Sequence, residues 1–171
     1  ERMLRWFGVD VAEAKVDGGL RLSVSGYARL VAKDLHVPAD LSSAAFFIVA
    51  AAFLDGSEIV MPNVGVNPSR RAIVDVLKSL GIDIEISDER EVCNEPVGTL
   101  LIRGHADIAA TQTQNLFSGS VIANMIDEIP ILAVAGTQLA GGLEIRNASE
   151  LRIKESDRIA AIVENLRRMN A

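Results

Sequence analysis

The chain has little of what disulfide-bonded folds and metal centres require. It contains one cysteine, Cys93, and two histidines, His36 and His105. Because a single cysteine cannot form an internal disulfide, the composition fits a reducing compartment, and we expect a cytoplasmic protein in which Cys93 is a semi-buried apolar residue. Two scattered histidines and one cysteine do not form the spaced cluster that zinc sites use. We therefore expect no metal and no other cofactor.

Long hydrophobic runs and an excess of positive charge are also absent. The longest unbroken apolar run, residues 44–54, is far shorter than the roughly 20 residues of a membrane-spanning helix. The formal net charge is −6, which argues against general binding to nucleic acid but leaves room for a local cationic pocket. We expect a protein without membrane or nucleic-acid partners.

What is present suits a folded domain. The 171 residues, 49% of them hydrophobic, are enough for one domain with a real core. The first residues, 1–7, resemble the middle of a helix without a cap, and the last residues follow directly on a predicted helix. We expect the chain to be a piece of a longer protein.

The spacing of apolar residues predicts alternating strands and helices. In the first part we expect strands at 20–24 and 30–37, a helix at 42–54, a strand at 57–61, a helix from Asn67-Pro68 to Gly81, and antiparallel strands at 82–86 and 98–103 with a turn near 94–96. In the second part we expect a helix from Asp127 to about Leu139, a strand at 143–146 and a helix from Ser156 to Met169. The order repeats, so the sequence predicts an α/β (α+β) fold with pseudo-repeats at about 30–105 and 106–171.

Helix starts are marked by short polar side chains. Asp40 or Ser42 can cap the first long helix, and Asp127 stands in the equivalent place of the second repeat. A cap oxygen accepts hydrogen bonds from amide groups that otherwise have no partner in the first turn. The residues therefore predict that Asp127 is held at a helix N-terminus.

A dense charged segment precedes the last predicted helix. Lys154, Glu155 and Arg158 flank Ser156 and Asp157, either of which can be the N-cap. One interpretation is a solvated capping segment with local ion pairs. The other is a site for anionic substrates, because a helix N-terminus with added cations attracts negative charge. The residues alone leave both open.

Several segments, in order along the chain, resemble one enzyme family. Residues 151–161 resemble the signature LRxKESDR, residues 125–135 resemble IDEIPxLAVA, residues 37–47 resemble VPGDxSSAAFF, residues 63–68 resemble NVGxNPxR, and residues 1–4 resemble the end of RDHTERML. Together they resemble 5-enolpyruvylshikimate-3-phosphate synthase. The resemblance implies an incomplete enolpyruvyl transferase inside-out barrel, built from repeated βαβαββ units, and a partial chain from the C-terminal-side domain of a two-domain enzyme.

The resemblance also implies a reaction. Enzymes of this family transfer the enolpyruvyl group of phosphoenolpyruvate to the 5-hydroxyl of shikimate 3-phosphate and release phosphate. This step belongs to the shikimate pathway, which leads to chorismate and the aromatic amino acids. The implied partners are the two anionic substrates and the missing remainder of the same enzyme. Because a cleft needs its opposing domain, we expect this piece alone to be inactive.

Four residues match the family's functional positions. The resemblance implies that Asp127 and Glu155 are catalytic, that Asp127 and Lys154 bind shikimate 3-phosphate, and that Arg158 binds phosphoenolpyruvate. Each also has a simpler role. Asp127 can be an N-cap, Lys154 an exposed lysine, Glu155 a capping glutamate, and Arg158 the partner of Asp157 or Glu155 in an ion pair.

Two positions depart from the family pattern. Glu150 stands where some relatives carry a substrate-binding asparagine, so it is not counted as a site residue. Ser42 and Ser43 are expected to be cap and first-turn residues, because the family's phosphate-binding serine pair belongs to an upstream segment.

Two alternatives remain. The first is the sister enolpyruvyl transferase that acts on UDP-N-acetylglucosamine. That enzyme usually carries a reactive cysteine in a glycine-rich loop, which the segment around Cys93, residues 91–96, does not match. The KESDR signature also argues against it. The second is a non-catalytic fragment that binds ligand weakly or only assembles with its other half.

Overall fold

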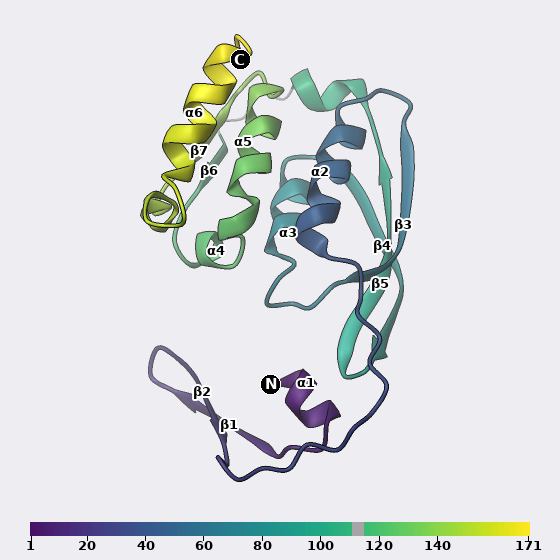
Figure 1. Cartoon of the computed structure of the whole chain (residues 1–171). Helices are drawn as coiled ribbons and strands as arrows, with labels where there is room; N and C mark the ends of the chain where they lie inside the picture. Colours follow the sequence, from purple (N-terminus) through teal and green to yellow (C-terminus); the bar gives the residue numbers. More distant parts are fainter. Residues whose placement is uncertain (111–114) are drawn as a thin grey trace.

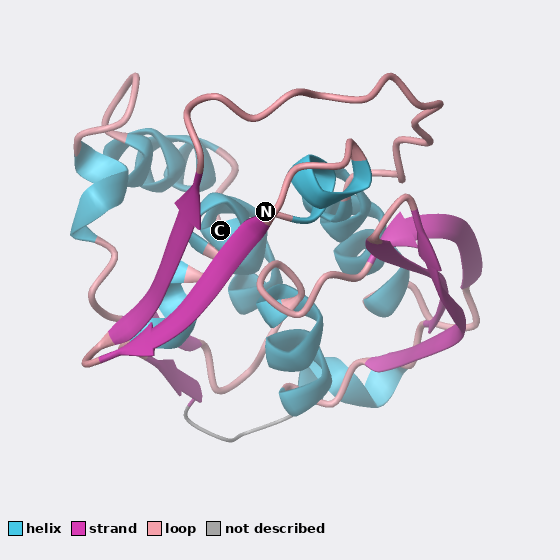
Figure 2. Cartoon of the chain, turned by 90° about the horizontal axis from the view of Figure 1, so that it is seen from below, coloured by secondary structure: helices cyan, strands magenta, loops and turns pink. Residues whose placement is uncertain are grey.

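The computed structural model describes residues 1–110 and 115–171 (Figure 1). Its first half contains α1 (Arg2–Trp6), β1 (Val11–Val16), β2 (Gly19–Val24), α2 (Leu41–Ala52), β3 (Glu58–Gly65), α3 (Ala72–Ser79), β4 (Asp83–Val92) and β5 (Glu95–Arg103). Its second half contains η1 (Ala106–Ala110), β6 (Asn115–Phe117), α4 (Ser120–Ala123), η2 (Ile126–Glu128), α5 (Ile129–Thr137), β7 (Leu143–Ile145), η3 (Ser149–Arg152) and α6 (Arg158–Arg168). Seen from below, helices lie in the middle with strands on either side (Figure 2).

A three-stranded antiparallel sheet of order β3-β5-β4 forms one side of the molecule. The predicted pairing of β4 with β5 is confirmed, but the turn lies slightly earlier than expected. Cys93 and Asn94 have φ values of 52° and 64°, and β5 begins at Glu95. Two successive residues with positive φ make a tight hairpin whose twist matches that of the strands.

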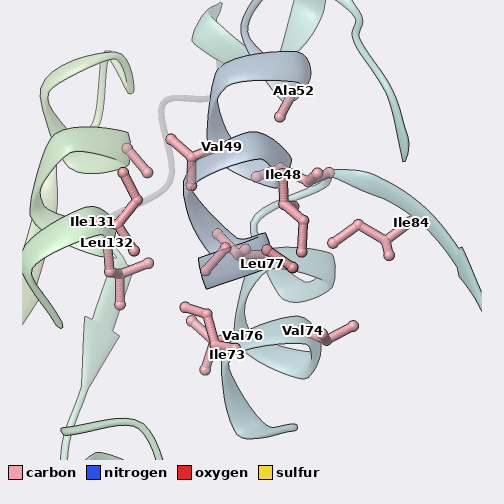
Figure 3. Packing of buried hydrophobic residues seen from close by; sticks show 14 of the residues in the cluster. Ile48, Val49, Ala52, Ile73, Val74, Val76, Leu77, Ile84, Ile131 and Leu132 are labelled. Carbon is pink, nitrogen blue, oxygen red and sulfur yellow. The ribbon is translucent and has the colours of Figure 1, made fainter. Parts of the chain in front are cut away.

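The core lies between this sheet and the second half of the chain, with α2 at its centre. The Asp40 carboxylate accepts a hydrogen bond of 2.8 Å from the Ser43 amide, so Asp40 is the N-cap. In Figure 3, Ile48 of α2 faces Ile84, which belongs to the sheet, and Val49 of α2 faces Leu132, which belongs to α5. Burying such side chains contributes about 1.5–3 kcal/mol each, so α2 fixes the two halves to each other.

The second half repeats the arrangement around α2. Strands β6 and β7 are parallel, and α5 lies between them in the sequence. In the first half, Ala39 and Val64 form an isolated parallel bridge on either side of α2. A further α-helix follows in each case, α3 after α2 and α6 after α5. This likeness supports pseudo-repeats at about 30–105 and 106–171, which we propose as the internal organisation.

Two predicted boundaries are wrong. Residues 30–37 form no strand, because no neighbouring strand pairs with them and most of their side chains are exposed. The helix expected from Asn67-Pro68 begins only at Ala72. The Asn67 side chain accepts a hydrogen bond of 3.1 Å from the Ser69 amide, and this local turn precedes the helix.

The long helices all begin on the same side. In Figure 1, α2, α3, α5 and α6 run upward from the lower side of the molecule, where α1, β1 and β2 also lie. The partial positive charges of four helix N-termini are therefore gathered on one face. Within residues 1–110 and 115–171, no helix has the length and apolarity needed to cross a bilayer.

Candidate functional site

Arg158 is the centre of the candidate site. It is the first residue of α6, and the N-cap Asp157 accepts a hydrogen bond of 2.9 Å from the Ala160 amide. Its Nη1 donates to Oδ1 of Asp127 at 3.1 Å, and its Nη2 donates to Oε2 of Glu155 at 2.7 Å. One guanidinium thus brings together three of the residues predicted from the sequence.

The local ion pairs differ in part from those expected. Of the two partners predicted for Arg158, Glu155 forms the pair and Asp157 does not. Asp157 instead lies 3.0 Å from Nη1 of Arg152. Arg152, which precedes α6, thus pairs with the cap residue Asp157, whereas Arg158 pairs with Asp127 on η2.

Asp127 does not cap a helix, which corrects the prediction. It lies inside the 3-10 turn η2, and its side chain caps no helix in the described chain; α5 begins at Ile129. Its carboxylate is bound by Arg158 instead of by backbone amides. Its charge is therefore balanced by a cation from an element 31 residues further along the chain.

Lys154 lies beside this cluster and has its own partner. Its Nζ is 2.9 Å from Oε1 of Glu150. The hydrogen bond to Glu150 is the main cause that raises the pKa of Lys154, with a smaller contribution from the charge of Asp127. Lys154 is therefore protonated and positively charged at neutral pH. Glu150, which departs from the family pattern, therefore has a structural role: its carboxylate pairs with Lys154.

The charges of Glu155 and Arg158 reinforce each other. A hydrogen bond from its own backbone amide, followed by the contact with Arg158, lowers the pKa of Glu155. The contact with Glu155 in turn raises the pKa of Arg158. The Glu155 side chain is 81% exposed and that of Arg158 31% exposed, so the pair is open to an incoming ligand. At neutral pH the Glu155 carboxylate is therefore ionised and paired with the positively charged Arg158.

Sequence reasoning missed three residues next to Asp127. Glu128 is buried, with 4% of its surface exposed, and accepts a hydrogen bond from Oγ of Ser42. Arg70 Nη2 lies 3.4 Å from the same hydroxyl. Arg70, Asp127 and Glu128 line one hollow of about 70 Å³. Local spacing carries no signal for the burial of Glu128, because its partner Ser42 lies 86 residues away along the chain.

The arrangement suits anions and proton exchange. Helix N-termini and three cations, Arg70, Lys154 and Arg158, attract carboxylates and phosphates. Two exposed carboxylates, Asp127 and Glu155, can give or take protons beside them. Within the described part of the chain, no group of three or more histidine, cysteine, aspartate or glutamate side chains is placed to hold a metal.

These features define an α/β domain with a candidate site for anions at its helix N-termini. The whole chain, residues 1–171, matches the family model described as EPSP synthase (3-phosphoshikimate 1-carboxyvinyltransferase). The chain belongs to this family. The predicted resemblance and the predicted fold class, an incomplete enolpyruvyl transferase fold, are thereby confirmed.

Individual relatives agree. The chain is 46% identical to the 3-phosphoshikimate 1-carboxyvinyltransferase of Gloeobacter violaceus, over 100% of this chain and 38% of the relative. It is 44% identical to the enzyme of the same name from Brevibacillus brevis, again covering 38% of it. A solved EPSP synthase from Acinetobacter baumannii superposes with a TM-score of 0.81 at 36% identity, covering 97% of this chain and 36% of that chain. The chain thus spans somewhat over a third of the length of these relatives.

Proposed function

We propose that the longer protein containing this chain transfers the enolpyruvyl group from phosphoenolpyruvate to the 5-hydroxyl of shikimate 3-phosphate. The observation that carries the proposal is the position of Arg158, which joins Asp127 to Glu155 beside Lys154 in a chain of this family. The remainder of the enzyme supplies the opposite wall of the site. The reaction takes place in the cytoplasm, which accords with a chain that has one cysteine.

Arg158 and Lys154 each bind one of the two substrates. A guanidinium presents parallel N–H groups that match a carboxylate or phosphate, so Arg158 binds phosphoenolpyruvate. Lys154, kept protonated by Glu150, binds shikimate 3-phosphate as a point charge. Asp127 contacts the same substrate near its reacting hydroxyl. Because the cations are already paired with carboxylates, each substrate anion takes the place of a protein carboxylate when it binds.

This exchange prepares the acid–base groups. When phosphoenolpyruvate binds Arg158, the contact that helps to lower the pKa of Glu155 weakens. Glu155 then takes up a proton more readily and donates it to the methylene carbon, while Asp127 accepts the hydroxyl proton. The resulting tetrahedral adduct collapses with the proton transfers reversed, which requires both carboxylates to be positioned around the new bond.

The sister reaction on UDP-N-acetylglucosamine is less well supported. Cys93 lies in the hairpin turn between β4 and β5, where its sulfur accepts a hydrogen bond of 3.4 Å from the His36 amide. It belongs to a different element from the Arg158 cluster. The relatives named above are 3-phosphoshikimate 1-carboxyvinyltransferases, which points to the same conclusion.

Phosphate release by the complete enzyme tests the proposal. With phosphoenolpyruvate we expect rapid release when shikimate 3-phosphate is added, and background release with UDP-N-acetylglucosamine or with no acceptor. Mass spectrometry of the product confirms that the enolpyruvyl group was transferred. Release that depends on the nucleotide sugar, or no release with either acceptor, would overturn the proposal.

A further inference from the structure

Glu128 is a buried charge that the proposed reaction does not use. It is the one charged residue in the buried class among the described residues, and Oγ of Ser42 donates a hydrogen bond to its Oε1. Burying a carboxylate is costly unless it is hydrogen-bonded or paired with a cation. An apolar residue would serve better if packing were its only task. Its neighbour in the sequence is Asp127.

The hydrogen bond ties a short turn to α2, the helix at the centre of the core. Ser42 lies in the first turn of α2, whose Ala45, Ile48 and Ala52 are fully buried. Glu128 lies in η2, and its amide donates a hydrogen bond of 3.0 Å to the Met125 carbonyl. A 3-10 turn of three residues has few internal hydrogen bonds. An external tether therefore decides how its side chains are directed.

Asp127 is held from two directions as a result. Arg158 contacts its carboxylate from the exposed side, at 3.1 Å. Glu128 fixes its backbone from the buried side through Ser42. Arg70, whose Nη2 donates to the Ser42 hydroxyl at 3.4 Å, lines the same hollow as Asp127 and Glu128. A substrate that takes Arg158 away from Asp127 leaves the Glu128 tether as its remaining support.

We propose that Glu128, together with Ser42, is a positioning pair that holds Asp127 in place for proton transfer while Arg158 is engaged by substrate. The inference rests on the proposed function, because it assumes that Asp127 acts in the reaction. Loss of the pair leaves both substrate-binding cations in place. It therefore affects turnover more than substrate binding.

The experiment uses the complete enzyme and the variant Ser42→Ala. We expect kcat to fall by roughly ten- to a hundredfold, since misplacing a reacting group by about 1 Å has effects of this size. The KM of each substrate should change by less than about twofold. Ser42→Thr keeps a hydroxyl and should restore most of the turnover. Ser43→Ala is the matched control, because Ser43 lies in the same turn and bonds Asp40 rather than Glu128.

A double-mutant cycle separates positioning from stability. The same substitution in an Asp127→Asn background should lower the remaining turnover by less than about twofold, because no catalytic carboxylate is left to position. If Ser42→Ala does not fold, Glu128→Asp replaces it, since that side chain keeps its charge but is too short to reach Ser42 without moving the turn. Equal losses of turnover in both backgrounds would overturn the inference alone. Near-normal turnover of Asp127→Asn by itself would overturn the catalytic role of Asp127 and this inference with it.

Discussion

At the scale of single residues, the decisive feature is an arginine that already has two partners. Arg158 holds Asp127 and Glu155 at 3.1 Å and 2.7 Å, so its positive charge is shared between two protein carboxylates. Lys154 is likewise bound to Glu150. Anionic substrates must therefore compete with protein carboxylates. The gain in specificity is that a ligand with one anionic group cannot replace all of these contacts.

The two cations should differ in the substrate they bind. In the complete enzyme we expect Arg158→Ala to raise the KM of phosphoenolpyruvate more than that of shikimate 3-phosphate, and Lys154→Ala to do the reverse. Loss of a charge-assisted hydrogen bond should weaken binding by about ten- to a hundredfold. Steady-state kinetics with each substrate varied in turn measures the contrast. Arg168→Ala is the control, because it breaks an ion pair at the far end of α6. Equal effects on both substrates would make Lys154 and Arg158 scaffold residues.

The carboxylates should act on the rate rather than on binding. We expect Asp127→Asn and Glu155→Gln to lower kcat by about 10²–10⁴-fold, since each keeps its shape but loses a proton-transfer role. Glu164→Gln, in the ion pair with Arg168, should leave kcat unchanged. Rapid-quench detection of the tetrahedral adduct shows which proton step is slowed. Near-normal turnover in both site variants would contradict the acid–base assignment.

At the scale of elements, the cap of α2 contributes to stability independently of the site. We expect Asp40→Ala to lower the free energy of unfolding by about 1 kcal/mol, because the Ser43 amide loses its partner. Asp40→Asn should retain most of this stability, since its side-chain oxygen can accept the same hydrogen bond. Urea unfolding followed by circular dichroism measures both. If the two variants are equally destabilised, the loss is not due to the cap.

The same cap predicts a pH dependence. The hydrogen bond from the Ser43 side chain, aided by the Ser43 amide, lowers the pKa of Asp40 below its usual range in the folded state. A lowered folded-state pKa stabilises the fold above the unfolded-state value, and this stability is lost as the pH falls through the folded-state pKa. The stability of the wild-type chain relative to Asp40→Asn should therefore be highest near neutral pH and decline below about pH 4. An unchanged difference between pH 7 and pH 3 would contradict this.

Local patterns predicted the elements well because their causes are local. The structure selects one of the two cap candidates predicted for each helix, Asp40 and Asp157, and confirms the β4–β5 pair and the end of α3 before Gly81; all of these follow from neighbouring residues. The prediction of a strand at 30–37 was wrong because a strand needs a neighbouring strand to pair with. Local alternation of apolar and polar residues does not show whether such a neighbour exists.

The sequence proposed candidate site residues but did not indicate the contacts between them. Asp127, Lys154, Glu155 and Arg158 were identified from motifs. The pairing of Asp127 with Arg158 joins η2 to α6 and is formed only when α5 packs against both the core and α6. Glu128 and Ser42 are 86 residues apart, so their hydrogen bond is a product of the packing of α2 on α5. Spacing along the chain carries no signal for either contact.

At the scale of the whole molecule, the helix N-termini face a side that this chain does not close. Catalysis of this kind depends on a site from which water is excluded and in which charges are held from both sides. Here Glu155 is 81% exposed and Asp127 is 44% exposed at the side chain. The chain covers 38% of the Gloeobacter violaceus relative, so more than half of such an enzyme lies outside it.

We therefore expect the isolated 171-residue chain to fold but to show no turnover. Its buried core joins both halves of the chain around α2, which supports folding, whereas Arg158 and Lys154 alone cannot close around two substrates. Phosphate release from phosphoenolpyruvate and shikimate 3-phosphate should equal the blank, and circular dichroism should show a folded protein. Co-expression with the remaining part of the enzyme should restore release, and should restore much less of it at low phosphoenolpyruvate when the chain carries Arg158→Ala. Because only the missing part differs between the two measurements, restored activity assigns the defect to the absent wall of the site. Release by the isolated chain well above the blank would mean that one face of helix N-termini is sufficient for the reaction.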